Sequence, residues 1–242
     1  MNIIGIINII AFLILATIGL VFTIKKRKDF INIVQLQIDK KTIIGFLTML
    51  FVSGFIMFFI FLINLKLGLL EIISRDNVFL LIKNIPIEFI NAMGEEFLFR
   101  ILVFLGLLFL IDNKIIALAL SSIMFCFMHT PESMISIVSY MFAGLMYGIA
   151  FLTLRTIWAP IGLHFGWNYF QGIVFGFPVS NQISDGYLLL EIVDSAMWNG
   201  GNIGPEGSIV GIFGRIVIII TILIIGFIIC KRMMSDQFLR IE

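Results

Sequence analysis

Long apolar segments constrain the fold of this chain more than any other feature. A helix needs about 20 mainly apolar residues to cross the hydrocarbon core of a bilayer, and several segments reach that length with few or no charges. Hydrophobic residues make up 60% of the 242 residues and charged residues 13%, whereas a soluble domain has roughly 45–50% and 25%. Because so few charges cannot cover this apolar surface in water, the sequence predicts an integral membrane protein.

We expect an all-α fold, a polytopic membrane bundle of about seven to eight transmembrane helices. The apolar stretch at 79–111 is too long for one straight span, so we divide it into an approach helix near the interface, up to about Ala92, and a span from about Gly94. The basic block at 25–28 follows the first apolar run, which we expect to be retained rather than cleaved as a signal peptide. The expected crossings are residues 3–24, 43–65, 94–111, 115–129, 133–154, 157–177 and 208–230.

The positions of Lys and Arg predict the orientation, because short cytoplasmic loops are enriched in basic residues. Seven crossings would put most of the 16 Lys and Arg on one face and only Lys66 and Arg75 on the other. We therefore expect the carboxyl terminus in the cytoplasm, with the amino terminus and the acidic loop at 178–207 outside. The Ile-, Lys- and Asn-rich composition suits a bacterial plasma membrane, and a net charge of +1 indicates no nucleic-acid partner.

Ionisable residues within the apolar segments are candidate functional residues, because burying one at the bilayer centre costs roughly 2.5–3.5 kcal/mol. Glu96 and Arg100 are four residues apart and can pair on one helix face, whereas Glu95 points about 100° away. We therefore expect an ion pair between Glu96 and Arg100 that leaves Glu95 free for chemistry. The alternative is a solvated helix end with no catalytic role.

The two histidines, His129 and His164, both lie within or at the end of apolar segments. His164 and Asn168 share a helix face, and both can donate hydrogen bonds to a developing negative oxygen. A single histidine of this kind is often a satisfied helix-end residue. The expected topology nevertheless places Glu95, His129 and Asn168 near the outer ends of their spans, with His164 one turn deeper, so these groups can cooperate.

Three motifs occur in order on successive expected helices: EExxxR at 95–100, FxxxH at 125–129 and HxxxN at 164–168. With them the chain resembles the CPBP family, which comprises the type II CAAX prenyl endopeptidases and the bacterial bacteriocin-processing and self-immunity (Abi) proteins. The resemblance is clearest over residues 94–177. It implies a catalytic membrane core at 79–242, preceded by membrane helices and a basic cytoplasmic link at 1–78.

The resemblance also implies an activity, that of a glutamic-type intramembrane endopeptidase. Glu95 would be the general base that activates a water, which His129 would help to hold and polarise, and His164 and Asn168 would form the oxyanion hole. The matching supporting positions are Glu96, Arg100 and Phe125. The implied substrate is a membrane-anchored or lipidated peptide or protein, cut by CAAX-type processing or in the maturation of a bacteriocin or pheromone. No metal or other cofactor is expected.

Two alternatives stay open at this point. In the first, the two histidines and a carboxylate hold a zinc ion with an open position for water, although the chain has no HExxH motif. In the second, the protein is not an enzyme but an immunity factor or a scaffold with a membrane-protein partner in a signalling system. Chelation separates the first from a metal-free protease, and alanine variants of the motifs separate the second.

Overall fold

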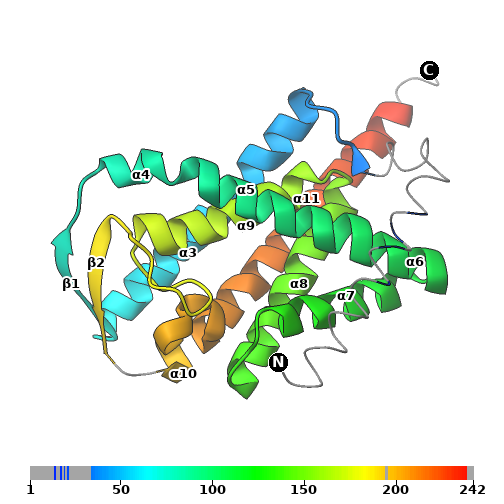
Figure 1. The fold of residues 1–242 in the computed structure, drawn as a ribbon. Helices are drawn as coiled ribbons and strands as arrows, with labels where there is room; N and C mark the ends of the chain where they lie inside the picture. Colours follow the sequence, from blue (N-terminus) through cyan, green and yellow to red (C-terminus); the bar gives the residue numbers. More distant parts are fainter. Residues whose placement is uncertain are drawn as a thin grey trace.

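The computed structural model describes residues 34–193 and 196–238, together with positions 14, 17, 19 and 21. The expected crossing at 3–24 and the basic block after it therefore lie outside the described residues, apart from these isolated positions. The described part is mostly helical (Figure 1). Its helices are α3 (Lys40–Lys66), α4 (Phe79–Lys83), α5 (Ile85–Glu96), α6 (Leu105–Ile111), α7 (Lys114–Met128), α8 (Met134–Leu154), α9 (Trp158–Asn168), α10 (Ala196–Asn199) and α11 (Ile209–Phe238).

Three of the described helices are long and apolar enough to cross a membrane: α3, α8 and the part of α11 over Ile209–Lys231. They correspond to the expected crossings at 43–65, 133–154 and 208–230. The 15 residues of α7 rise about 22 Å, which is less than the roughly 30 Å of the hydrocarbon core. The expected total of seven to eight crossings is therefore not confirmed by the described residues.

The helix that carries the first motif is continuous, which corrects the expected division of residues 79–111. α5 runs through a π-helical segment, η1 (Phe97–Phe104), directly into α6. The interruption lies at Asn84 instead, between α4 and α5, and Pro86 occupies the first turn of α5, where its missing N–H costs no helical hydrogen bond. Gly94 lies inside the helix, because one glycine lowers helix stability without ending a helix held by its neighbours.

Two short strands depart from the all-α expectation. β1 (Leu70–Arg75) pairs antiparallel with β2 (Leu188–Ile192), so the link after α3 is joined to the long loop expected at 178–207. Leu70 is buried against Phe61 and Phe177, and the two strands lie side by side at one end of the molecule (Figure 1). This ribbon anchors the long loop. Short 3₁₀ turns, η3 (Gly201–Ile203) and η4 (Pro205–Gly207), then lead from α10 into α11.

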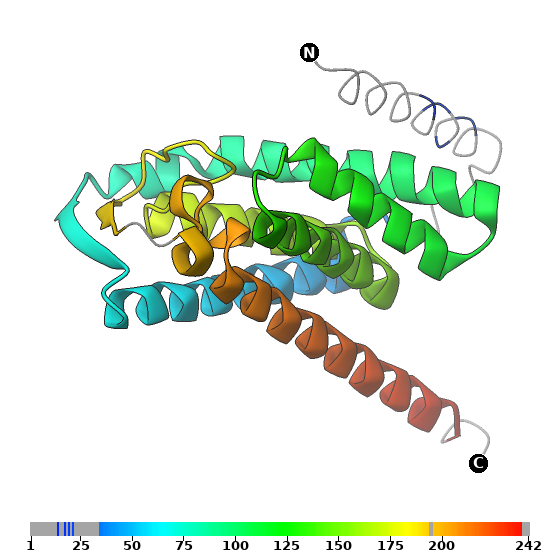
Figure 2. The ribbon, with the colours of Figure 1, turned by 90° about the horizontal axis from the view of Figure 1, so that it is seen from below.

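Close helix packing positions the three motif-bearing helices. α9 lies between α3 and α5 (Figure 2), and a Cβ added at Gly162 or Gly166 would collide with backbone oxygens of α3. α8 packs against both α7 and α11, and a Cβ at Gly144 would come within 2.7 Å of Ser122 Cα in α7. These small residues let the backbones approach one another. The second π-helical segment, η2 (Tyr169–Val174), continues α9 and ends the helical part of the expected crossing at 157–177.

Candidate active site

One carboxylate faces both imidazoles of the chain. Glu95 lies near the end of α5, His129 caps the end of α7, and His164 lies in the middle of α9. Glu95 Oε2 is 3.5 Å from His129 Nε2 and 3.9 Å from His164 Nε2. Asn168, one turn after His164, lines the same space. The structure thus brings together the four residues for which the resemblance implies catalytic roles.

The remaining ring nitrogen of each histidine is held by an acceptor. His129 Nδ1 is 2.9 Å from the carbonyl oxygen of Phe125, and His164 Nδ1 is 2.8 Å from Glu96 Oε1. Because a carbonyl and an ionised carboxylate only accept hydrogen bonds, both Nδ1 atoms carry the proton. Each Nε2 is then an acceptor in the neutral imidazole and a donor in the imidazolium. The orientation of both rings is therefore fixed by groups outside the reaction space.

A fully buried ion pair supports this arrangement. Arg100 Nε donates to Glu96 Oε2 at 2.8 Å, and both side chains have no exposed surface. Arg100 Nη1 also donates to the carbonyl of Gly144 at 3.2 Å, and its guanidinium lies over the rings of Phe125 and Tyr147. The i to i+4 spacing predicts the pair. His164 is the third member of the network, and its hydrogen bond to Glu96 could not be predicted from the sequence.

Aromatic rings cover the faces of both imidazoles. Phe125 and Tyr140 lie against His129, with ring centroids at 4.3 and 4.8 Å. Tyr147 stacks on His164, with centroids 4.5 Å apart and planes at 16°. Phe125 thus has two contacts with His129, one through its ring and one through its carbonyl. The rings exclude water from the imidazole faces and leave the Nε2 edges open toward Glu95.

A small cavity lies where these groups converge. Its volume is about 20 Å³, enough for one water molecule, which needs roughly 10–15 Å³ by this kind of measure. Glu95 Oε2 is a buried atom with no hydrogen-bond partner among the described residues. The lining residues are Glu95, Phe125, His129, Tyr140, Ala143, Tyr147, His164, Asn168, Ser180, Glu206 and Arg215. The chamber offers several polar partners for one small polar molecule.

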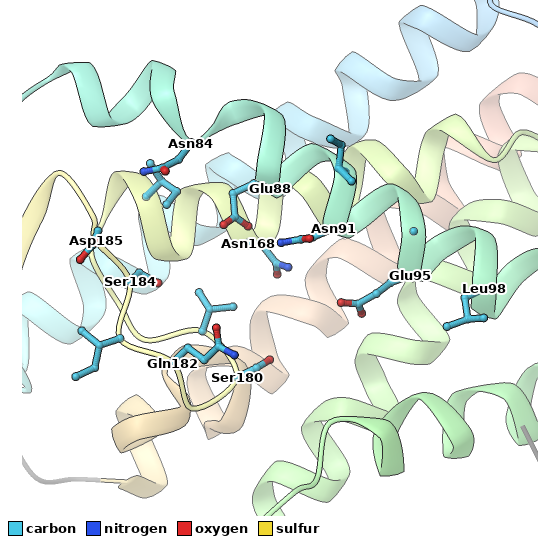
Figure 3. A pocket seen from close by; sticks show the side chains of 15 residues that line it. Asn84, Glu88, Asn91, Glu95, Leu98, Asn168, Ser180, Gln182, Ser184 and Asp185 are labelled. Carbon is cyan, nitrogen blue, oxygen red and sulfur yellow. The ribbon is translucent and has the colours of Figure 1, made fainter. Parts of the chain in front are cut away.

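A larger cavity of about 610 Å³ shares Glu95, Asn168 and Ser180 with this chamber. Figure 3 shows Glu88 and Glu95 of α5 and Asn168 of α9 pointing into a space that faces Ser180 and Gln182 of the long loop. Its lining is largely polar and contains no Lys or Arg. Glu95 therefore lines both a water-sized chamber and a cavity whose volume can hold a short segment of peptide.

A second buried polar cluster adjoins the chamber and was not identified from the sequence. Glu206 Oε1 accepts hydrogen bonds from Tyr140 Oη at 3.0 Å, from Ser180 N at 2.6 Å and from Ser180 Oγ at 2.7 Å. Arg215 donates to the Glu206 carbonyl at 2.8 Å and also contacts Ser139. Both ionisable residues are almost completely buried. The signal that could have identified them is the one used for Glu95, a charge next to or inside an apolar span.

Two of the three motif-bearing helices, α5 and α9, change geometry next to the site. η1 begins at Phe97, directly after Glu95 and Glu96, and η2 begins at Tyr169, directly after Asn168. π-helical turns are rare and occur frequently at functional sites. Across residues 34–193 and 196–238, no group of three or more His, Cys, Asp or Glu side chains has an arrangement that could hold a metal ion.

Comparison with known proteins adds independent information. A family model described as Type II CAAX prenyl endopeptidase Rce1-like matches residues 77–170, a range that contains all three motifs and ends just after Asn168. Neither the curated proteins nor the solved structures gave a significant match. The match agrees with the family indicated by the motifs. The matched region of this integral membrane protein, which is less than half of the chain, is therefore similar to the Rce1-like domain of type II CAAX prenyl endopeptidases.

Proposed function

We propose that the protein is a glutamic-type intramembrane endopeptidase that uses Glu95 to activate water. The observation that carries the proposal is the convergence of two imidazole Nε2 atoms on Glu95 Oε2, at 3.5 and 3.9 Å, around a chamber of about 20 Å³. Peptide hydrolysis needs a base, a water and hydrogen-bond donors for the tetrahedral oxyanion. The match of residues 77–170 to a family model of type II CAAX prenyl endopeptidases supports the same reaction.

The proposed reaction uses these groups in two steps. Glu95 takes a proton from the water, which is also held by His129, and the resulting hydroxide attacks the carbon of the scissile carbonyl. The carbonyl oxygen becomes an oxyanion that accepts hydrogen bonds from Asn168 Nδ2 and, in its imidazolium form, His164 Nε2. Glu95 then gives its proton to the leaving nitrogen as the C–N bond breaks. The products are a carboxylate-ended and an amine-ended peptide.

The surroundings of Glu95 support a peptide as substrate. The cavity of about 610 Å³ beside it is lined by amide and hydroxyl side chains, including Asn91, Gln182 and Ser184. Such groups can hydrogen-bond to the backbone of an extended segment. A membrane-anchored or lipidated peptide could therefore keep its apolar part in the bilayer while its polar cleavage region enters this cavity. CAAX-type processing and maturation of a bacterial peptide both fit this description.

The test compares peptides released from membranes of cells that carry wild-type protein or Glu95→Gln. We expect new peptide ends that depend on Glu95 and persist in a control variant, Glu71→Gln, whose carboxylate is exposed on β1. A purified Glu95→Gln protein that melts like the wild type should cleave the identified substrate at least about 100-fold more slowly, because general acid–base catalysis contributes 10²–10⁴-fold. Identical peptide ends in both strains would contradict the proposal.

A zinc-dependent protease is the second candidate. One observation favours it, although the described residues contain no group of three or more side chains arranged to hold a metal ion. Each Nδ1 is held by an oxygen acceptor, as the non-ligating nitrogen of a zinc-ligating histidine usually is, and both Nε2 atoms face the Glu95 carboxylate. Chelation followed by removal of the chelator decides between the two. We expect activity to be unchanged, whereas loss on chelation with recovery after added Zn²⁺ would replace the glutamic mechanism with the metal-dependent one.

A further inference from the structure

An apolar groove with a basic rim lies at the other end of the bundle. It has a volume of about 600 Å³ and is lined by residues from the start of α3, the end of α8 and the later part of α11. Tyr140, near the start of α8, lines the candidate active site, whereas Leu154, at the end of α8, lines the groove. Fourteen residues of helix rise about 21 Å, so the groove is separate from that site.

The groove combines apolar walls with three cations. The walls include Ile44, Met49, Leu154, Ile225 and Ile229, and Ile44 and Ile229 are 53% and 41% exposed. The basic side chains of the lining are Lys40, Lys41 and Arg155, and the lining contains no Asp or Glu. None of the three cations forms an ion pair with another described residue. The nearby Asp39 carboxylate is engaged, because it accepts the Thr42 N–H at 2.8 Å.

Hydrogen bonds between distant parts of the chain hold the rim together. Ile157 N donates to Val34 O at 3.0 Å, and Trp158 Nε1 donates to Leu36 O at 3.4 Å. These bonds fix the segment before α3 against the turn between α8 and α9. Lys40 and Lys41 thereby line the same groove as Arg155, which caps α8 in a left-handed conformation with φ 53°. The clustering of the three cations is therefore part of the tertiary fold.

We propose that this groove binds one anionic phospholipid, with the phosphate between Lys40, Lys41 and Arg155 and an acyl chain along the apolar walls of α3 and α11. The basic rim is complementary to an anion and the apolar walls are complementary to an acyl chain. A phospholipid has both in one molecule, whereas a free phosphate has no apolar chain. Basic pockets between membrane helices bind anionic headgroups in this way. The charge distribution predicts that this end of the bundle faces the cytoplasm, where anionic lipids attract basic residues.

Native mass spectrometry of the full-length protein in a neutral detergent tests the proposal. The probes are phosphatidylglycerol, phosphatidylcholine with the same acyl chains, and sn-glycerol 3-phosphate. We expect one phosphatidylglycerol to bind at least about tenfold more tightly than phosphatidylcholine, with glycerol phosphate too weak to detect. The K40Q/K41Q/R155Q variant should lose at least about tenfold in phosphatidylglycerol affinity, since each charge contributes roughly fivefold.

Two further variants separate this site from general lipid contact. K66Q/R75Q/K83Q removes the same net charge away from the groove and should bind phosphatidylglycerol like the wild type. Gly45→Leu keeps all three cations but fills the groove, and it should abolish binding. Equal binding of both lipids, equal loss in the two triple variants, or full binding by Gly45→Leu would each overturn the proposal. Tight binding of glycerol phosphate would overturn it too, because the site would then recognise a free anion.

Discussion

Removal of the Arg100 guanidinium should destabilise the protein more than removal of any exposed cation. Arg100→Met keeps most of the aliphatic volume but leaves Glu96 as a buried carboxylate whose charge-assisted bond at 2.8 Å is lost. The hydrogen bond to Gly144 O and the contacts with two aromatic rings are lost as well. Breaking one side of a buried ion pair costs about 3–5 kcal/mol.

The assay is thermal unfolding of the purified protein in detergent. At about 2–4 °C per kcal/mol for a chain of this length, the expected drop in Tm is about 6–20 °C. The matched control is Arg75→Met on β1, whose side chain is exposed and whose loss should change stability by less than about 0.5 kcal/mol. A drop in Tm no larger than that of the control would refute the reasoning.

A double variant tests the pairing itself. Glu96→Gln together with Arg100→Met removes both charges, and the amide introduced at position 96 would still offer an oxygen to His164 Nδ1. The double variant should therefore be less destabilised than the sum of the two single variants, with a coupling energy of about 0.5–3 kcal/mol. Simple additivity would mean that the two side chains do not stabilise each other.

Three other perturbations follow from the same structure. Glu206→Ala removes the acceptor shared by Tyr140 and Ser180, so the loop near 180 should be cut faster in limited proteolysis, whereas Glu206→Gln, which keeps an oxygen, should show a smaller effect. Gly166→Ala places a Cβ within 2.8 Å of Leu50 O and should lower stability by about 1–3 kcal/mol; an unchanged Tm would contradict this packing. The backbone hydrogen bond from Thr42 lowers the pKa of Asp39. The stability that the ionised Asp39 cap gives to the start of α3 is therefore complete above the ordinary pKa of 3.8 and is lost as the pH falls below that value. Below about pH 4, the Tm of the wild type should therefore fall more than the Tm of the Asp39→Asn variant, which does not titrate there. Parallel curves of Tm against pH would contradict a stabilising role for the ionised Asp39 cap.

Hydropathy alone was sufficient to predict the helices that carry a long apolar run. The expected span at 43–65 becomes α3, extended to Lys40 because Asp39 and Thr42 form a capping box. The span at 133–154 becomes α8, which begins immediately after Ser133 for the same reason. Strong periodic segments with a capping residue thus define both the element and its start.

Other parts of the fold depend on tertiary contacts that hydropathy does not report. β1 is formed because its partner strand returns more than 100 residues later, and neither segment identifies the other in the sequence. The π-helical segments after Glu96 and Asn168 have no sequence signature. The sequence predicts a division of the helix near Gly94, whereas the structure has the break at Asn84. A charged residue inside an apolar span is the most useful sequence indicator of the site. Burying a charge in the membrane costs free energy whether or not the helix boundaries are predicted correctly.

The motifs located the site residues but not the geometry that orients them. The i to i+4 rule predicts that Glu96 pairs with Arg100, but the hydrogen bond from His164 Nδ1 to Glu96 joins helices 68 residues apart. Glu206 and Tyr140 contribute to the same chamber from outside the motifs. Their roles arise from the approach of the segment before α11 to α8, which no local pattern in the sequence specifies.

The most direct measurement is hydrolysis in H₂¹⁸O by purified protein in liposomes, with a substrate found by the peptide-end comparison. The account predicts one ¹⁸O atom in the new carboxyl end, made at an unchanged rate after chelation and at least about 100-fold more slowly by a folded Glu95→Gln variant. Cleavage by Glu95→Gln at the wild-type rate would contradict the central claim that Glu95 activates the water.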